Sequence, residues 1–70
     1  MGDVRTGRVV AFDAGRGLGL IRGSDGTELA FHSTRLADGS RTVEVGADVV
    51  YARGPGPAPG SWEATEIVKR

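Results

Sequence analysis

The chain has 70 residues, which is enough for one small domain near the lower size at which proteins fold without disulfides or metals. It contains no cysteine, which excludes disulfides, a thiol nucleophile and cysteine-ligated metal, and is typical of a reducing compartment. Nine basic and nine acidic residues cancel, whereas general binders of phosphate backbones usually carry a basic surplus. Neither a signal peptide nor a membrane-spanning stretch is evident, so we expect a cytoplasmic protein without a membrane partner.

Three strands are predicted in the N-terminal half. Residues 6–12 are β-branched in the middle and form the first strand. Residues 16–22 form the second strand, and residues 27–32 form the third. The segment 23–26 between them ends in Asp-Gly, which supplies the positive φ that a tight hairpin turn needs.

Two more strands are predicted in the C-terminal half. Residues 33–44 have no clear period and are expected to form a long loop with a short helical turn near Leu36. Residues 49–53 and 62–68 form the fourth and fifth strands. The glycine- and proline-rich segment 54–61 cannot hold a ladder, so we expect it to be an exposed loop.

Five short strands in a chain of this length predict a small all-β barrel and a single domain over residues 1–70, because closure removes strand edges that would otherwise aggregate. The expected core consists of Val9, Ile21, Leu29, Phe31, Leu36, Val43, Val49, Tyr51 and Ile67. Trp62 either packs near one end of the barrel, which we expect, or stacks on a base; the sequence does not fix its side.

The second strand has an unusual pattern in which Leu18 and Leu20 alternate with Gly17 and Gly19. Side chains alternate between the two faces of a strand, so the leucines share one face and the glycines share the other. The leucines are either core residues with the glycines facing outward, or part of a surface that contacts unpaired nucleic-acid bases. The residue pattern by itself leaves both interpretations open.

The first third of the chain carries a cluster of basic residues: Arg5, Arg8, Arg16 and Arg22. Within that third only Asp3 and Asp13 oppose them, so a basic stripe is compatible with zero net charge. Eight of the nine cations are arginine, which stacks on bases and binds phosphate in a bidentate manner. A general codon bias toward arginine explains the same composition.

Several segments together carry a family resemblance. Residues 6–14 match an opening strand, Arg16–Ile21 matches a motif that usually runs Lys-Gly-Phe-Gly-Phe-Ile, and Glu28–His32 matches one that usually ends in Phe-Val-His. Residues 43–49 match the stretch that leads into a fourth strand. In this order and spacing the segments resemble bacterial cold-shock proteins over almost the whole chain.

The resemblance implies a five-stranded antiparallel OB-fold barrel that holds single-stranded DNA or RNA on its first three strands. In the family, aromatic rings on these strands and in one loop stack on successive bases with little sequence preference. At those positions this chain has Ala11, Leu18, Leu20, Ala30, Ser33 and, in the loop, Ser40. Phe12, His32 and the basic Arg16 are retained in kind. Since stacking contributes about 1–3 kcal/mol per base, losing about four rings removes more than about 4 kcal/mol, or a thousandfold in affinity.

We therefore expect weak, largely sequence-independent binding of single-stranded RNA or DNA, with a role as an RNA chaperone or regulator implied by the resemblance alone. The expected contact residues are Arg8, Val10, Phe12, Arg16, Leu18, Leu20 and His32. In the alternative hypothesis the apolar surface around Leu18 and Leu20 is a protein interface, most simply a homodimer, and nucleic-acid binding is lost.

No catalytic residue, metal site or cofactor is expected. His32 is the single histidine, and its neighbour Ser33 cannot form a hydrogen-bonded catalytic pair with it by adjacency alone. The carboxylates show no paired spacing. The glycines of residues 15–19 are followed by a strand, whereas dinucleotide-binding loops precede a helix.

Overall fold

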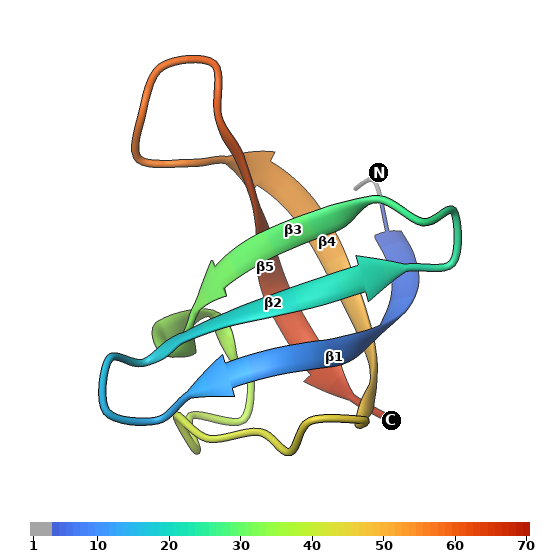
Figure 1. The fold of residues 1–70 in the computed structure, drawn as a ribbon, viewed down its shortest axis with the longest axis vertical. Coiled ribbons are helices and arrows are strands. Elements are labelled where there is room, and N and C mark those ends of the chain that lie inside the picture. The colour runs from blue at the N-terminus through green and yellow to red at the C-terminus, as the bar shows by residue number, and fades with distance from the viewer. Residues whose placement is uncertain (1–3) are drawn as a thin grey trace.

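The computed structural model describes residues 4–70, in which five strands and one short 3₁₀ helix are arranged as a barrel (Figure 1). The elements are β1 (Val4–Asp13), β2 (Leu18–Gly23), β3 (Glu28–His32), η1 (Ser33–Arg35), β4 (Asp48–Pro55) and β5 (Trp62–Lys69). The strands close in the order β1-β2-β3-β5-β4. The all-β, five-stranded barrel is thus confirmed and is consistent with an OB-fold-like domain.

One pair of neighbouring strands departs from the expected antiparallel arrangement. β3 and β5 are parallel, whereas the other four neighbouring pairs among the described residues are antiparallel. Strand direction cannot alternate all the way around a closed ring with an odd number of strands. One parallel pair is therefore a necessary consequence of closing five strands.

Several predicted strand boundaries shift by one or two residues, including the start of β1 at Val4 instead of residue 6, and two of the shifts have a clear cause. β2 begins at Leu18 instead of residue 16, because Gly17 belongs to the preceding turn and donates its backbone N–H to the carbonyl of Asp13 at 2.8 Å. β4 continues to Pro55, which is paired with Trp62. Proline is tolerated at the end of a strand that needs no donor at that position, so the exposed loop is residues 56–61.

The predicted turn at Asp25-Gly26 and the helical turn before Leu36 are both confirmed. Gly26 has φ 87°, and the backbone N–H of Gly23 donates to the carbonyl of Thr27 at 2.8 Å across the turn. The short 3₁₀ helix ends at Arg35, and Leu36, which caps it, has a buried side chain. The chain from there to residue 47 is a loop. Residues 4–70 contain no helix with the length and apolar character that crossing a bilayer requires.

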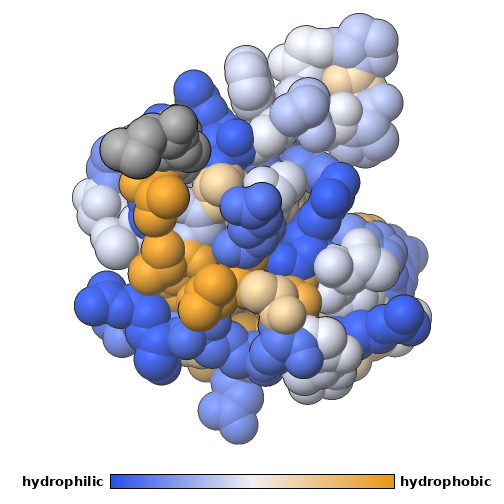
Figure 2. All heavy atoms as spheres, turned by 180° about the vertical axis from the view of Figure 1, so that it is seen from behind, coloured by the Kyte–Doolittle hydropathy of each residue, from blue (hydrophilic) through white to orange (hydrophobic). Residues whose placement is uncertain are grey.

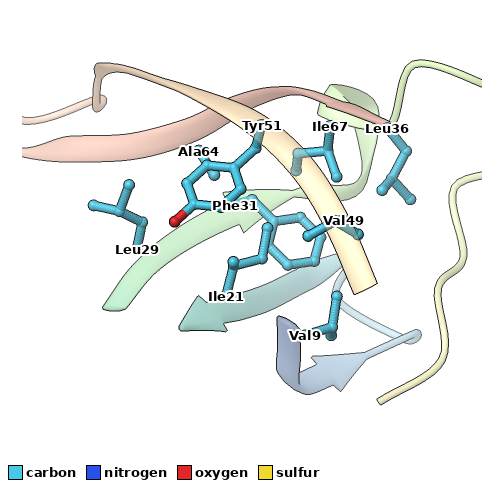
Figure 3. Close-up of a cluster of buried hydrophobic side chains, with 9 residues drawn as sticks. All are labelled: Val9, Ile21, Leu29, Phe31, Leu36, Val49, Tyr51, Ala64 and Ile67. Carbon is cyan, nitrogen blue, oxygen red and sulfur yellow. The ribbon is translucent and has the colours of Figure 1, made fainter. Parts of the chain in front are cut away.

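The core is close to the expected one (Figure 3). It comprises Val9, Ile21, Leu29, Phe31, Leu36, Val49, Tyr51, Ala64 and Ile67. Val43 was expected in it but is only partly buried, because it lies in the loop and packs against the cluster from outside. Ala64 is a buried residue that the sequence analysis missed, since one small side chain gives a weak hydrophobic signal.

The position of Gly19 fixes which side of β2 faces the core. Gly19 is paired with Phe12 on β1 and with Phe31 on β3. The two rings are stacked, with centroids 6.0 Å apart and planes inclined by 9°. A Cβ atom added at Gly19 would overlap the Phe31 ring, so this ring occupies the space that a larger residue would need.

We expect Gly19→Ala to lower the free energy of unfolding by about 1–3 kcal/mol, because a new methyl group must displace the Phe31 ring in a packed core. The urea unfolding midpoint measures this change. Gly15→Ala is the matched control, because its added Cβ would meet its nearest neighbour at an ordinary 3.4 Å, and we expect a change within about 0.5 kcal/mol. Equal midpoints for the two variants would contradict the packing described here.

Candidate nucleic-acid interface

The register of β1, β2 and β3 arranges their outward side chains in cross-strand rows. Residues paired on adjacent strands point to the same side of a sheet. The outward rows are Arg8–Arg22–Glu28, Ala11–Leu20–Ala30 and Asp13–Leu18–His32. They alternate with the inward rows Val9–Ile21–Leu29 and Phe12–Gly19–Phe31. We call the surface formed by the three outward rows the β1–β3 face; its strands lie in front in Figure 1.

The two leucines of β2 lie on the β1–β3 face and not in the core. Leu18 is 47% exposed beside His32, and Leu20 is half-buried between Ala11 and Ala30. The orientation implied by the family resemblance is therefore observed, and the interpretation of these leucines as core residues is excluded. The centre of the face is apolar, and the side chains on either side of Leu20 are the small ones of Ala11 and Ala30.

Phe12 was expected beside the leucines, but the structure places it on the opposite side of β1. The pairing of β1 with β2 shifts by one residue between Val9 and Ala11, which is a β-bulge at Val10. The extra residue inverts the alternation, so Ala11 points outward and Phe12 packs against the core. Val10 itself is half-buried on the outer side, next to Arg8 and Arg22.

His32 is exposed on this face and its ring is held by the start of η1. Its Nδ1 atom accepts the backbone N–H of Thr34 at 3.2 Å and lies 3.0 Å from the Thr34 hydroxyl. Because Nδ1 acts as an acceptor, the neutral imidazole carries its proton on Nε2. His32 therefore offers a ring surface and one N–H donor next to Leu18.

Arg8, Val10 and Arg22 line a surface hollow of about 570 Å³ at the other end of the face. Asp48 and Arg70 complete its charged rim. Arg16 is not part of this hollow; it lies in the turn between β1 and β2, close to Leu18 and Asp13. The predicted contact residues other than Phe12 are thus distributed along one surface, with basic groups at both ends.

Each arginine of the N-terminal cluster has an acidic partner. The pairs are Arg5–Asp25 at 3.1 Å, Arg8–Asp48 at 3.2 Å, Arg16–Asp13 at 3.9 Å and Arg22–Glu28 at 2.9 Å. Only Asp3 and Asp13 oppose this cluster within the first third of the sequence, and Asp3 lies outside the described residues. The other three carboxylates lie beyond the first third of the chain, at 6, 20 and 40 residues from the arginines that they meet. The face is therefore electrically balanced.

These ion pairs are exposed and correspondingly weak. Arg8 and Asp48 keep 65% and 59% of their side-chain surface in solvent. Exposed pairs contribute about 0–1 kcal/mol and are screened by salt. The lowered pKa of Asp25 comes first from the backbone N–H of Thr27, and the Coulombic effect of Arg5 is smaller. An arginine on this surface can therefore exchange its carboxylate for a phosphate at low cost.

A second apolar surface lies on the far side of the barrel (Figure 2). Val50 is paired with Val68, and Val4 is paired with Ala52, on the outer side of β1, β4 and β5. Val4 is 66% exposed and Val68 is 50% exposed. This valine surface has no basic residues in its rows and provides positions that match Leu18 in exposure but lie away from the β1–β3 face.

Residues 4–70 contain no grouping of three or more histidine, cysteine, aspartate or glutamate side chains that could hold a metal ion. Comparison of the chain with known protein families and with curated proteins finds no match.

Proposed function

We propose that this protein is a cold-shock-type module that binds single-stranded RNA or DNA weakly and with little sequence preference, and that it acts in the cytoplasm without catalysing a reaction. The supporting observation is the register of β1, β2 and β3, which turns Leu18, Leu20 and His32 outward between basic ends. This is the geometry by which small barrels contact unpaired bases.

The chemistry of the face accounts for weak binding. Leucine side chains provide apolar contact with a base but have no π surface, so they supply less than a stacked ring. Arg8, Arg16 and Arg22 each already face a carboxylate, whose negative charge offsets the attraction between the guanidinium and a phosphate. Both kinds of contact are insensitive to base identity, which is why little sequence preference is proposed.

The proposal is tested by titrating labelled oligo-dT and oligo-U, each of about eight nucleotides, and following fluorescence anisotropy. We expect dissociation constants in the micromolar range or weaker. With about two or three phosphates contacted, the logarithm of affinity should fall with the logarithm of salt concentration with a slope of about −1.4 to −2. Leu18→Glu should weaken binding about tenfold by placing a carboxylate among phosphates, whereas Val68→Glu on the valine surface should not. The absence of binding at low salt would refute the proposal.

A second candidate is a homodimer formed through the same leucines. The balanced charge of the β1–β3 face favours it, because two copies would meet without net repulsion. Sedimentation analysis at high protein concentration distinguishes the two candidates. A dimer that Leu18→Glu converts to a monomer supports the interface, and a wild-type protein that stays monomeric excludes it.

Adding rings at the leucine positions should strengthen oligonucleotide binding. We expect the double variant Leu18→Phe/Leu20→Phe to bind about tenfold more tightly, since each ring restores part of a stacking contribution of about 1–3 kcal/mol. The small neighbours Ala11 and Ala30 leave room beside residue 20. Val68→Phe is the control, and anisotropy titration is the measurement. Equal affinities for all three proteins would show that bases do not lie on this face.

Removing one carboxylate from the face should also strengthen binding. In Glu28→Gln the guanidinium of Arg22 loses its anionic partner and becomes available to a phosphate. We expect an affinity several-fold higher at low salt and a salt slope steeper by about 0.7, the value for one additional phosphate on a single strand. Glu66→Gln, on β5, makes the same change in net charge away from the face. If both variants gained equally, general charge and not the local ion pair would control binding.

A further inference from the structure

The aromatic residues of this chain are distributed unevenly between core and surface. Phe31 and Tyr51 are buried, and Phe12 is stacked on Phe31. Trp62 is 54% exposed, and among the phenylalanine, tyrosine and tryptophan residues of positions 4–70 it alone belongs to the exposed class. Among these three residue types, Trp62 therefore offers the most exposed ring for stacking on a base.

Trp62 lies at the start of β5, where the β4–β5 hairpin extends past the end of the barrel (Figure 1). It is two residues before the buried Ala64, so its side chain leaves the strand on the same side as that residue. Arg53, paired with Ala64, shares this side, and its guanidinium carbon lies 4.6 Å from the centroid of the indole ring. The cation–π contact orients the ring, while about half of the residue stays open to solvent.

The hairpin that carries Trp62 is held by hydrogen bonds at its tip. The backbone N–H of Gly56 donates to the carbonyl of Ser61 at 2.9 Å, and that of Ser61 donates to the carbonyl of Ala58 at 3.0 Å. The Ser61 hydroxyl donates to the same carbonyl at 2.7 Å. Prolines in this loop restrict φ further. The ring is thus presented by a pre-organised element, which lowers the entropic cost of binding.

The hairpin is also next to the β1–β3 face. The row Ala11–Leu20–Ala30 continues onto Glu63, which is paired with Ala30 and precedes Ala64. Two strand spacings, or roughly 10 Å, separate the backbones at Leu20 and Glu63. The Trp62 side chain leaves β5 on the opposite side from Glu63, so a nucleic-acid strand on the β1–β3 face contacts it by passing over the edge of β3, within the roughly 4–16 nucleotides that one such barrel covers. A groove of about 350 Å³ lies between His32 and Pro55–Pro57, is also lined by Arg35 and Glu63, and connects the face to the hairpin.

We propose that Trp62 and Arg53 form a base-stacking site for single-stranded nucleic acid at the end of the barrel, beyond the β1–β3 face. This inference rests on the proposed function and names its aromatic contact. A base stacks on the exposed surface of the indole, and the guanidinium on the same side of the hairpin is placed to meet an adjacent phosphate.

Trp62 is the single tryptophan of the chain, so its fluorescence reports on this site alone. Unlabelled oligo-dT of about eight nucleotides should quench it, with the same midpoint as anisotropy of the labelled oligonucleotide. An abasic oligonucleotide of equal length, which carries phosphates without bases, should not quench it. Trp62→Leu should lower affinity about tenfold, Trp62→Phe should retain most of it, and Val68→Ala should leave it unchanged.

The outcomes separate this inference from the function on which it rests. Binding by anisotropy without tryptophan quenching, together with an unchanged affinity of a folded Trp62→Leu variant, overturns the Trp62 site and leaves the β1–β3 face intact. Equal quenching by the abasic oligonucleotide also overturns it, since phosphate contact would then suffice. The absence of anisotropy change for the wild-type protein refutes the proposed function itself.

Discussion

The stacked pair of Phe12 and Phe31 over Gly19 is the packing contact on which the rest of the structure depends. It fills the barrel beside β2 and sets which side of that strand is inside. Once Gly19 faces the core, alternation turns its neighbours Leu18 and Leu20 outward. The same contact turns both phenylalanine rings to the core side, so Leu18 and Leu20 are the large apolar side chains at the centre of the surface of the first three strands. Core packing and surface chemistry are therefore determined together.

Charge balance is the second determinant of what the surface can do. Arginine guanidinium groups are present at both ends of the β1–β3 face, yet each is matched by a carboxylate within 4 Å. Long-range attraction of a polyanion follows summed charge, so such a surface attracts nucleic acid little at a distance. At contact, a phosphate can replace the carboxylate partner of an exposed arginine at low cost. Under the proposed function, this combination would give slow electrostatic capture of nucleic acid and fast release.

Much of the fold could be predicted because its signals are local. Asp25-Gly26 marks a hairpin by its own backbone preference, and alternation around Ile21 and Leu29 identifies an inward row. The side of β1 on which Phe12 lies could not be predicted. A bulge at Val10 reverses the alternation of inward and outward side chains, and the residue types around it give no signal of a bulge. Acidic partners such as Asp48 are 40 residues from the arginine they meet, so counting neighbours along the chain misses them. Of the candidate site, the outward leucines were expected only from the family resemblance, since their own pattern fits either face, and the ion pairing was not expected.

The parallel contact between β3 and β5 has a consequence for how the ring of strands is completed. In the described residues their register consists of the single pair Ala30–Glu63, supplemented by a bridge between Leu36 and Ile67 and one backbone hydrogen bond from Ala37. So few backbone bonds cannot hold two strands, and burial of Leu36 and Ile67 must supply most of the cohesion at this seam. A substitution that reduces the buried volume of Leu36 or Ile67 would separate β3 from β5 and open the barrel. The antiparallel pairing of β1 with β2 and of β2 with β3 would stay intact.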